Sequence, residues 1–457
     1  MKRIVTISII ASTLLFSANS ASNLKHDTVS KIQNDSSITN STVKQADITI
    51  SNSSDVDGLT VTQKNGTEAG NLIQGTSVSD STVRQGSTEI SGARVLNLGL
   101  DSVSEIKSSN IESSSSVSQS NFIITDSNAT DSTADDVNIG ASNSIDSSTV
   151  NGSDVKQSYT ILSNGADVSN LDVNQTNSIE TSTIRNSSHI TQGMLDVNNS
   201  TLNGLSSTYG YSNNTNIIAD TTSDGSNIEQ NRISLKNGAD VKSVKNGSRN
   251  EVLNSDIESS NIVQNSISVD NSGVDTMNHY RKNSIDDLSA NNSYIIQNRV
   301  TIESNSDVKN FTSNRYINNK IKSVTANGST IAQNDVLILN GIVNGLDIGQ
   351  ENTIEATTTD GTADSNVSQS YISQGKVVLR DTGAINIVEQ DANGGDFLQN
   401  KIKDIDIEGH SSISQGDLIS YESYINNLTA QENNSISSLK MDNGANLTQG
   451  QILINGY

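Results

Sequence analysis

Aliphatic and polar residues alternate along this chain in a short motif that recurs twelve times. Each copy has an aliphatic residue, any residue, a Gln, a small residue, and apolar-leaning residues three and five positions after the Gln. Successive copies lie 33 to 41 residues apart, and a period of this length indicates stacked supersecondary units. The twelve Gln residues are Gln45, Gln85, Gln119, Gln157, Gln192, Gln230, Gln264, Gln297, Gln333, Gln374, Gln415 and Gln449.

The motif has the period of a β-strand. The residue two before the Gln is Val, Ile or Leu in all twelve copies, and the residue five after it is aliphatic in all but the copy with Ser420. Alternation with period two, rich in Val and Ile, is typical of strands with one buried face. The alternation shifts by one after the Gln, where Ala, Gly, Ser or Asn always follows. Because Gly and Asn tolerate positive φ, we expect a bend or bulge there.

Two further arcs complete each repeat. The second is seen in residues 167–175, and the third is marked by Asn-x-Ile or Asn-x-Val, as in Asn177-Ser178-Ile179. Helical repeats are disfavoured, because no 3.6-residue apolar stripe is present and Ser, Asn, Thr and Gly are poor helix formers. The predicted fold is all-β: a β-solenoid, similar to a parallel β-helix, of about twelve imperfect coils of about 37 residues with three short strands each.

The recurring Gln has a structural interpretation. An inward-facing Gln without a partner would cost about 1–3 kcal/mol. In strands stacked about 4.8 Å apart, each side-chain amide can donate to one neighbour and accept from the other. We therefore predict that the twelve Gln residues form a structural ladder and bind no ligand.

The N-terminal segment predicts export. Met1, Lys2 and Arg3 precede an apolar stretch over residues 4–16, and small residues follow up to Ala21. This order is typical of a secretory signal peptide, which we assign to residues 1–21. No later segment approaches 18 apolar residues, so no transmembrane segment is predicted. Residues 22–40 are predicted as a partial coil and residues 41–457 as the repeat domain, in a protein that is secreted or held at the cell surface.

Neither end of the repeat region shows the polar helix or atypical repeat that normally caps a solenoid. The segment before the first repeat resembles a third arc alone, and the chain stops just after a first arc. We expect such incomplete ends to stack head to tail, so that the main partner is another copy of the chain. Cell-surface or matrix components are further expected partners.

Composition narrows the function. The chain has 51 acidic and 28 basic residues, a formal net charge of −23, and no Cys, Pro or Trp. Such a surface repels nucleic acid and anionic lipid, and an exported chain without Cys has no disulfide framework. The polar composition also permits disorder. Aliphatic residues held in fixed phase over the whole chain argue against it.

A search for chemistry finds no site. His26, His189, His279 and His410 lie in different repeats without metal-ligand spacing, and no nucleophile elbow, P-loop or dinucleotide fingerprint is present. The acidic pairs Asp135-Asp136 and Asp286-Asp287 are interpreted as solvated loop residues. The acidic stretches 126–131 and 391–396 do not complete a calcium loop, which leaves weak cation association as an alternative. We predict a protein that is not an enzyme and has no catalytic, cofactor-binding or metal-binding residues.

In these features the chain resembles secreted bacterial functional amyloids of the curli and Fap type. The resemblance rests on the signal peptide, imperfect repeats with regular Gln and Asn, Gly after Gln, the absence of Cys and Pro, and the final Tyr457. Curlin repeats are shorter, and Fap fibre subunits have fewer repeats split by linkers. The resemblance implies an extracellular fibre subunit of a biofilm matrix or adhesive surface that self-assembles without cofactors.

Three functions are therefore compared. The first is a structural protein that self-assembles into extracellular or cell-surface fibres. The second is a monomeric β-solenoid adhesin or surface-binding rod. The third is a polysaccharide-active β-helix enzyme, which the absence of Trp and of clustered carboxylates disfavours.

Overall fold

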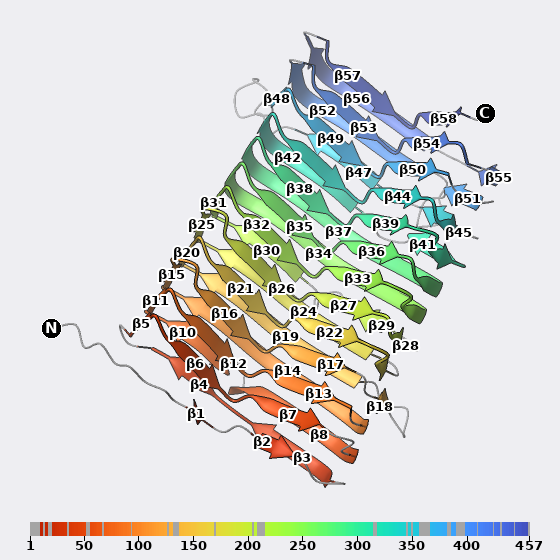
Figure 1. Ribbon diagram of the computed structural model, residues 1–457. Helices are drawn as coiled ribbons and strands as arrows, with labels where there is room; N and C mark the ends of the chain where they lie inside the picture. Colours follow the sequence, from red (N-terminus) through yellow and green to blue (C-terminus); the bar gives the residue numbers. More distant parts are fainter. Residues whose placement is uncertain are drawn as a thin grey trace.

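The structure is a computed structural model (Figure 1). It describes residues 10–455 except 12–13, 17–20, 34–35, 52–54, 66–67, 93, 126–127, 131–136, 169–170, 203–204, 208–214, 314–317, 344–345, 349–350, 356–365, 382–384, 390–397, 409, 424, 430–431 and 443. The regular structure in these residues is β-strand, and the strands stack in parallel ranks along one axis (Figure 1). One short pair, β8 with β9, is antiparallel. The predicted all-β solenoid is therefore confirmed.

Two sheets of 13 strands each, called sheet A and sheet B here, are formed by the first arc of the repeats. Sheet A consists of β1 (Ile10–Ala11), β6 (Thr42–Gln45), β12 (Thr82–Gln85), β16 (Ser116–Gln119), β21 (Asp154–Gln157), β26 (His189–Gln192), β32 (Asn227–Gln230), β35 (Asn261–Gln264), β38 (Tyr294–Gln297), β43 (Thr330–Gln333), β49 (Tyr371–Gln374), β53 (Ser412–Gln415) and β57 (Asn446–Gln449). Sheet B consists of β2 (Leu14–Phe16), β7 (Ile48–Ser51), β13 (Thr88–Ser91), β17 (Phe122–Thr125), β22 (Thr160–Ser163), β27 (Leu195–Asn198), β33 (Ile233–Lys236), β36 (Ile267–Asp270), β39 (Val300–Glu303), β44 (Val336–Leu339), β50 (Val377–Arg380), β54 (Leu418–Tyr421) and β58 (Ile452–Asn455).

The third sheet, called sheet C, contains the rest of each coil. Its longer strands are β3 (Ala21–Asp27), β8 (Asp55–Asn65), β14 (Arg94–Lys107), β19 (Val137–Asp146), β24 (Leu171–Glu180), β34 (Asp240–Glu258), β37 (Gly273–Asn291), β42 (Asn318–Asn327), β52 (Leu398–Glu408) and β56 (Glu432–Met441). Its shorter pieces are β4 (Ser30–Ile32), β5 (Ser37–Thr39), β9 (Glu68–Ala69), β10 (Asn71–Gln74), β11 (Ser77–Ser79), β15 (Asn110–Glu112), β18 (Asn128–Thr130), β20 (Thr149–Asn151), β23 (Asp167–Val168), β25 (Thr183–Arg185), β28 (Thr201–Leu202), β29 (Leu205–Ser207), β30 (Thr215–Ala219), β31 (Thr222–Asp224), β40 (Asp307–Val308), β41 (Phe311–Ser313), β45 (Ile342–Val343), β46 (Leu346–Ile348), β47 (Glu351–Glu355), β48 (Asn366–Ser368), β51 (Ile385–Glu389) and β55 (Ile425–Thr429).

The coil is divided differently from the expected three short strands. The predicted first arc is split between sheets A and B, whereas the predicted second and third arcs lie together in sheet C. There the strands are continuous for up to 19 residues, as in β34 and β37. The predicted bend explains the split between sheets A and B. All twelve residues that follow a repeat Gln have φ between 54° and 69°.

The coils enclose two separate apolar cores. One lies between sheet B and the first part of sheet C, and includes Leu162 and Val173. The other lies between sheet A and the later part of sheet C, and includes Val155 and Ile179. Along β24 the chain passes from the first core to the second through buried Gln175 and Asn177. A polar column therefore separates the two cores along the stack.

Candidate functional site

The twelve repeat Gln residues form one column through the interior of the stack. They occupy equivalent register positions in neighbouring strands of sheet A, as Gln119 and Gln157 do. The Nε2 atom of each donates to the Oε1 atom of the Gln in the preceding coil, over eleven contacts of 2.7–2.9 Å. From Gln85 to Gln415 these residues are fully buried. Each coil thus has an interior donor and acceptor that only a neighbouring coil in register can pair.

The Gln amides also join opposite walls of the coil. Gln157 Nε2 donates to the backbone oxygen of Ser144 at 3.3 Å, and Gln192 Nε2 to that of Ser178 at 3.2 Å. These acceptors lie on β19 and β24 of sheet C, across the interior from sheet A. The second amide hydrogen is therefore used within the coil while the first is used between coils.

A second amide column runs beside the first. Asn residues of sheet C donate from Nδ2 to Oδ1 of the following coil at 2.6–2.9 Å. Its direction is opposite to that of the Gln column, so the two rows of amide dipoles oppose each other. The sequence marked most of these positions as Asn-x-Ile or Asn-x-Val but did not indicate their hydrogen bonds. The members are Asn143, Asn177, Asn216, Asn250, Asn283, Asn319, Asn352, Asn400 and Asn434.

The small residue after each Gln connects the two columns. Ser158 Oγ donates to Asn143 Oδ1 at 2.8 Å, and Asn298 Nδ2 donates to Asn283 Oδ1. At Gly193 a Cβ atom would overlap the side-chain amide of Gln175. Positive φ alone would allow several residue types at this position. The space beside the amide columns therefore limits the size of the residue that follows the Gln.

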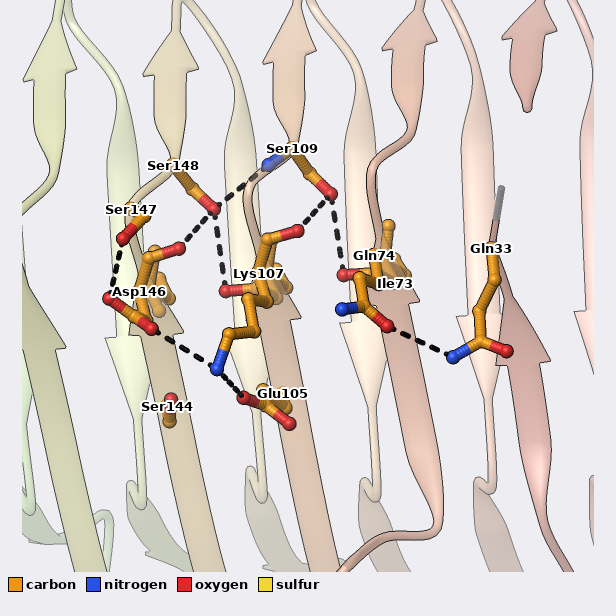
Figure 2. Close-up of polar contacts among 12 residues, drawn as sticks. Gln33, Ile73, Gln74, Glu105, Lys107, Ser109, Ser144, Asp146, Ser147 and Ser148 are labelled. Atoms are coloured by element: carbon orange, nitrogen blue, oxygen red, sulfur yellow. Dashed lines mark hydrogen bonds and ion pairs between the residues drawn. The ribbon is translucent and has the colours of Figure 1, made fainter. Parts of the chain in front are cut away.

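Hydroxyl groups form further ladders at the corners of the coil, as Figure 2 shows for Ser109 and Ser148. Ser109 N donates to Ser148 Oγ at 3.2 Å, and Ser148 Oγ donates to the backbone oxygen of Asp146 at 2.8 Å. A second ladder runs through a Ser four residues before the Gln, where Ser226 N donates to Ser260 Oγ at 3.1 Å. Ser stands at this position in all coils but the last, which has Ala445. The fixed distance from the Gln makes this column visible in the sequence, but the predicted ladder included only the Gln residues.

Two carboxylates lie at the bend between sheets A and B, called the A–B bend here, and both accept hydrogen bonds from the next coil. Asp335 Oδ1 accepts from Lys376 N at 3.1 Å and Ser373 Oγ at 2.8 Å, and Asp417 Oδ1 accepts from Gln451 N at 2.9 Å. Each side chain thus accepts from a backbone N–H at the bend of the next coil. Burial raises the pKa of Asp335, and the Arg299 guanidinium partly offsets this effect.

Charged side chains on the outside of sheet C alternate in sign. Asp286, Lys322, Glu355 and Lys403 occupy one register column over four successive coils. Lys322 Nζ lies 3.5 Å from Asp286 Oδ2. A hydrogen bond from Lys320 lowers the pKa of Glu355. Because opposite charges attract and like charges repel across neighbouring strands, this order favours the observed register over shifted ones.

The other residues considered from sequence are not brought together. His26, His189 and His279 lie on β3, β26 and β37, and His410 follows β52. Asp135, Asp136 and the stretch 391–396 lie outside the described residues, as do parts of 126–131. The described residues contain no group of three or more His, Cys, Asp or Glu side chains placed to hold a metal. Within the same residues, no helix is long and apolar enough to cross a membrane.

The two ends of the stack differ from its interior. The last coil, which contains Gln449, exposes Ile436, Ile452 and Ile454 by 51%, 43% and 54%. The residues in register with them one coil earlier, Ile402, Leu418 and Ser420, are fully buried. The fold and its amide columns define the chain as a parallel β-solenoid protein whose last described coil exposes apolar residues. No family model matches the chain, and no curated protein or solved structure matches it.

Proposed function

We propose that this chain is an exported structural protein that self-assembles head to tail into fibres outside the cell or on its surface. The observation that carries the proposal is the apolar end formed by β56, β57 and β58. In the described residues these strands pair on one side only, with β52, β53 and β54. A sheet edge with unpaired backbone groups and exposed aliphatic residues is a template for another chain.

The first coil of a second copy fits this end. Thr42–Gln45 and Ile48–Ser51 have the same motif as the strands that follow each coil inside the chain. Continuing the internal register would place Ile48 on Ile452 and Ile50 on Ile454. It would also allow Gln45 Nε2 to donate to Gln449 Oε1, as each Gln does to the preceding one inside the stack. The internal coil-to-coil contacts thus supply the pattern for a contact between copies.

Charge supports end-to-end rather than side-to-side association. The net charge of −23 makes the long sides of two rods repel each other. Ile452 and Ile454 of the last coil are in register with buried Leu418 and Ser420, so they face the end of the stack. Stacking would bury them while keeping the acidic sides in solvent. The resemblance to curli and Fap fibre subunits agrees with this direction of assembly, and it is the basis for proposing a role in biofilm matrix or adhesion.

A second candidate, a surface-binding rod, is favoured by one observation. The outward positions of sheet B hold a row of aliphatic residues over the last four coils: Leu337, Val378, Ile419 and Leu453. Leu453 is 39% exposed, and the other three are partly exposed. Apolar residues in a row on the outer face of a sheet are a feature of contact surfaces. A monomer that uses this row to bind a cell surface or matrix component is the alternative.

The test compares end variants in the chain without residues 1–21. Electron microscopy and sedimentation over a range of protein concentrations should show filaments for the unmodified chain. The double variant Ile452→Asp, Ile454→Asp should remain as short rods, because two charges would be buried in the junction. The control Ser268→Asp, at an outward position of β36 in the middle of the stack, should still form filaments. Short rods from the unmodified chain at every concentration would contradict the proposal and favour the second candidate.

A further inference from the structure

The N-terminal edge of the stack is occupied by the chain's own first residues. β1 pairs in parallel with β6, in the register Ile10 with Lys44 and Ala11 with Gln45. β2 pairs in parallel with β7, and Leu14 lies opposite Ile48. The offset is 34 residues in both pairs, the same as between β32 and β35 inside the stack. In this N-terminal segment, β1 and β2 therefore take the positions that the sheet A and sheet B strands of a preceding coil would occupy (Figure 1).

The sequence of this segment follows the repeat motif. Ile9 stands two positions before Ala11, Ser12 directly follows it, and Leu14 and Phe16 are three and five positions after it. These are the aliphatic, small and apolar positions of the motif. Ala11 stands where every later coil has Gln. The segment thus continues the backbone pairing of the stack but provides no side-chain amide for the Gln column.

The segment coincides with the predicted signal peptide and with the contact surface of the proposed fibre. A preceding copy would place β57 and β58 on β6 and β7, where β1 and β2 lie in this structure. One side of a strand pairs with only one neighbour. We propose that residues 10–16 block head-to-tail stacking, so that assembly begins only after residues 1–21 are removed. This inference rests on the proposed function, because it concerns the same junction.

A preceding copy makes the stronger contact once the segment is gone. β1 and β2 provide five residue pairs to β6 and β7, whereas each internal neighbour provides eight. A copy also supplies Gln449, whose Oε1 atom can accept from Gln45. The segment therefore covers the edge formed by β6 and β7 with fewer backbone pairs than a complete neighbouring coil would make there. Its removal couples assembly to export and keeps the precursor from polymerising inside the cell.

The experiment compares the purified full chain, residues 1–457, with residues 22–457 at equal concentration. Light scattering gives the lag before assembly, and electron microscopy identifies filaments. The full chain should stay monomeric or show a lag that is longer by at least about tenfold. One or two net backbone hydrogen bonds between the segment and the edge would lower the population of the free edge by about this factor. Equal lags for both chains would overturn this inference and leave the proposed function standing. If neither chain assembles, the proposed function fails, and the inference fails with it.

Proline variants locate the block within the leader. In the full chain, Leu14→Pro with Phe16→Pro removes two backbone N–H groups from β2 and should shorten the lag towards that of residues 22–457. The control Thr6→Pro, outside both strands, should leave the long lag unchanged. A double variant that stays blocked while residues 22–457 assemble would overturn the role of β2. A control that releases the block would overturn it as well.

Discussion

The coil that contains Gln374 and the last coil, which contains Gln449, share one motif but differ in what surrounds them. Ile372 and Gln374 are fully buried, with a neighbouring coil on each side. The last coil has one described neighbour and exposes three isoleucines. This difference shows that the inward side chains of a coil are buried by the neighbouring coils and are not buried by their own coil alone. A solenoid whose repeats depend on their neighbours is stabilised by every coil added to it.

The largest expected effect comes from the interior Gln column. Gln264 donates to Gln230 and Glu251 and accepts from Gln297. Gln264→Ala leaves these groups unpaired beside a cavity, so we expect a loss of about 3–5 kcal/mol in the free energy of unfolding. Gln449 is only partly buried, and Gln449→Ala should cost about 1–2 kcal/mol, because it breaks the hydrogen bonds to Gln415 Oε1 and to the backbone oxygen of Asn400. Urea unfolding of the monomer measures both losses, and equal losses would contradict the dependence of each coil on its neighbours.

The apolar core gives the second comparison. Ile372→Ala removes a buried side chain and should cost about 2–4 kcal/mol. Ile454 is 54% exposed, so Ile454→Ala should change the stability of the monomer by less than about 0.5 kcal/mol. The same substitution should weaken assembly, since that is when Ile454 is proposed to become buried. Thermal unfolding at low concentration and sedimentation at high concentration separate the two effects, and a large loss in the monomer would argue against an open end.

The corner hydroxyl groups predict a smaller difference. Ser260 Oγ accepts from Ser226 N and donates to the backbone oxygen of Glu258. Ser260→Ala should therefore cost about 1–2 kcal/mol in the free energy of unfolding. The reverse change in the last coil, Ala445→Ser, should stay within about 0.5 kcal/mol. Chemical denaturation of both variants checks the pair, and a neutral Ser260→Ala would show that the corner ladder contributes no net stability.

The smallest expected effect is a pH dependence at the A–B bend. Burial raises the pKa of Asp335 above its ordinary value of 3.8, so the folded state favours the protonated carboxyl group. The stability gained from this proton is complete below pH 3.8 and is lost as the pH rises through the raised pKa. Asp335→Asn, which is neutral at all pH values, should remove this part of the slope. As the pH rises above 3.8, the free energy of unfolding of the variant should increase relative to that of the unmodified chain. Free energies that change with pH in the same way for both chains would contradict a raised pKa of Asp335.

The sequence predicted the features that repeat within one coil. The period, the strand alternation and the bend after each Gln follow from local patterns, and the φ values after all twelve Gln residues confirm the bend. The division into two cores could not be predicted, because it depends on which coil positions face each other across the interior. The Asn positions were marked by the Asn-x-Ile and Asn-x-Val pattern, but their pairing from coil to coil was not predicted, and one pair, Asn352 with Asn400, spans 48 residues. The corner Ser column lies at a fixed distance from the Gln and was open to prediction, although only the Gln column was predicted.

Fibre diffraction of residues 22–457 tests the central claim, that coils stack in one register within the chain and between chains. We predict filaments with a meridional reflection at about 4.7–4.8 Å, because the strands then lie across the fibre axis in every copy and through every junction. Isolated rods roughly 55–60 Å long, which twelve coils at this spacing would give, would contradict head-to-tail assembly if they persist at the highest concentration reached.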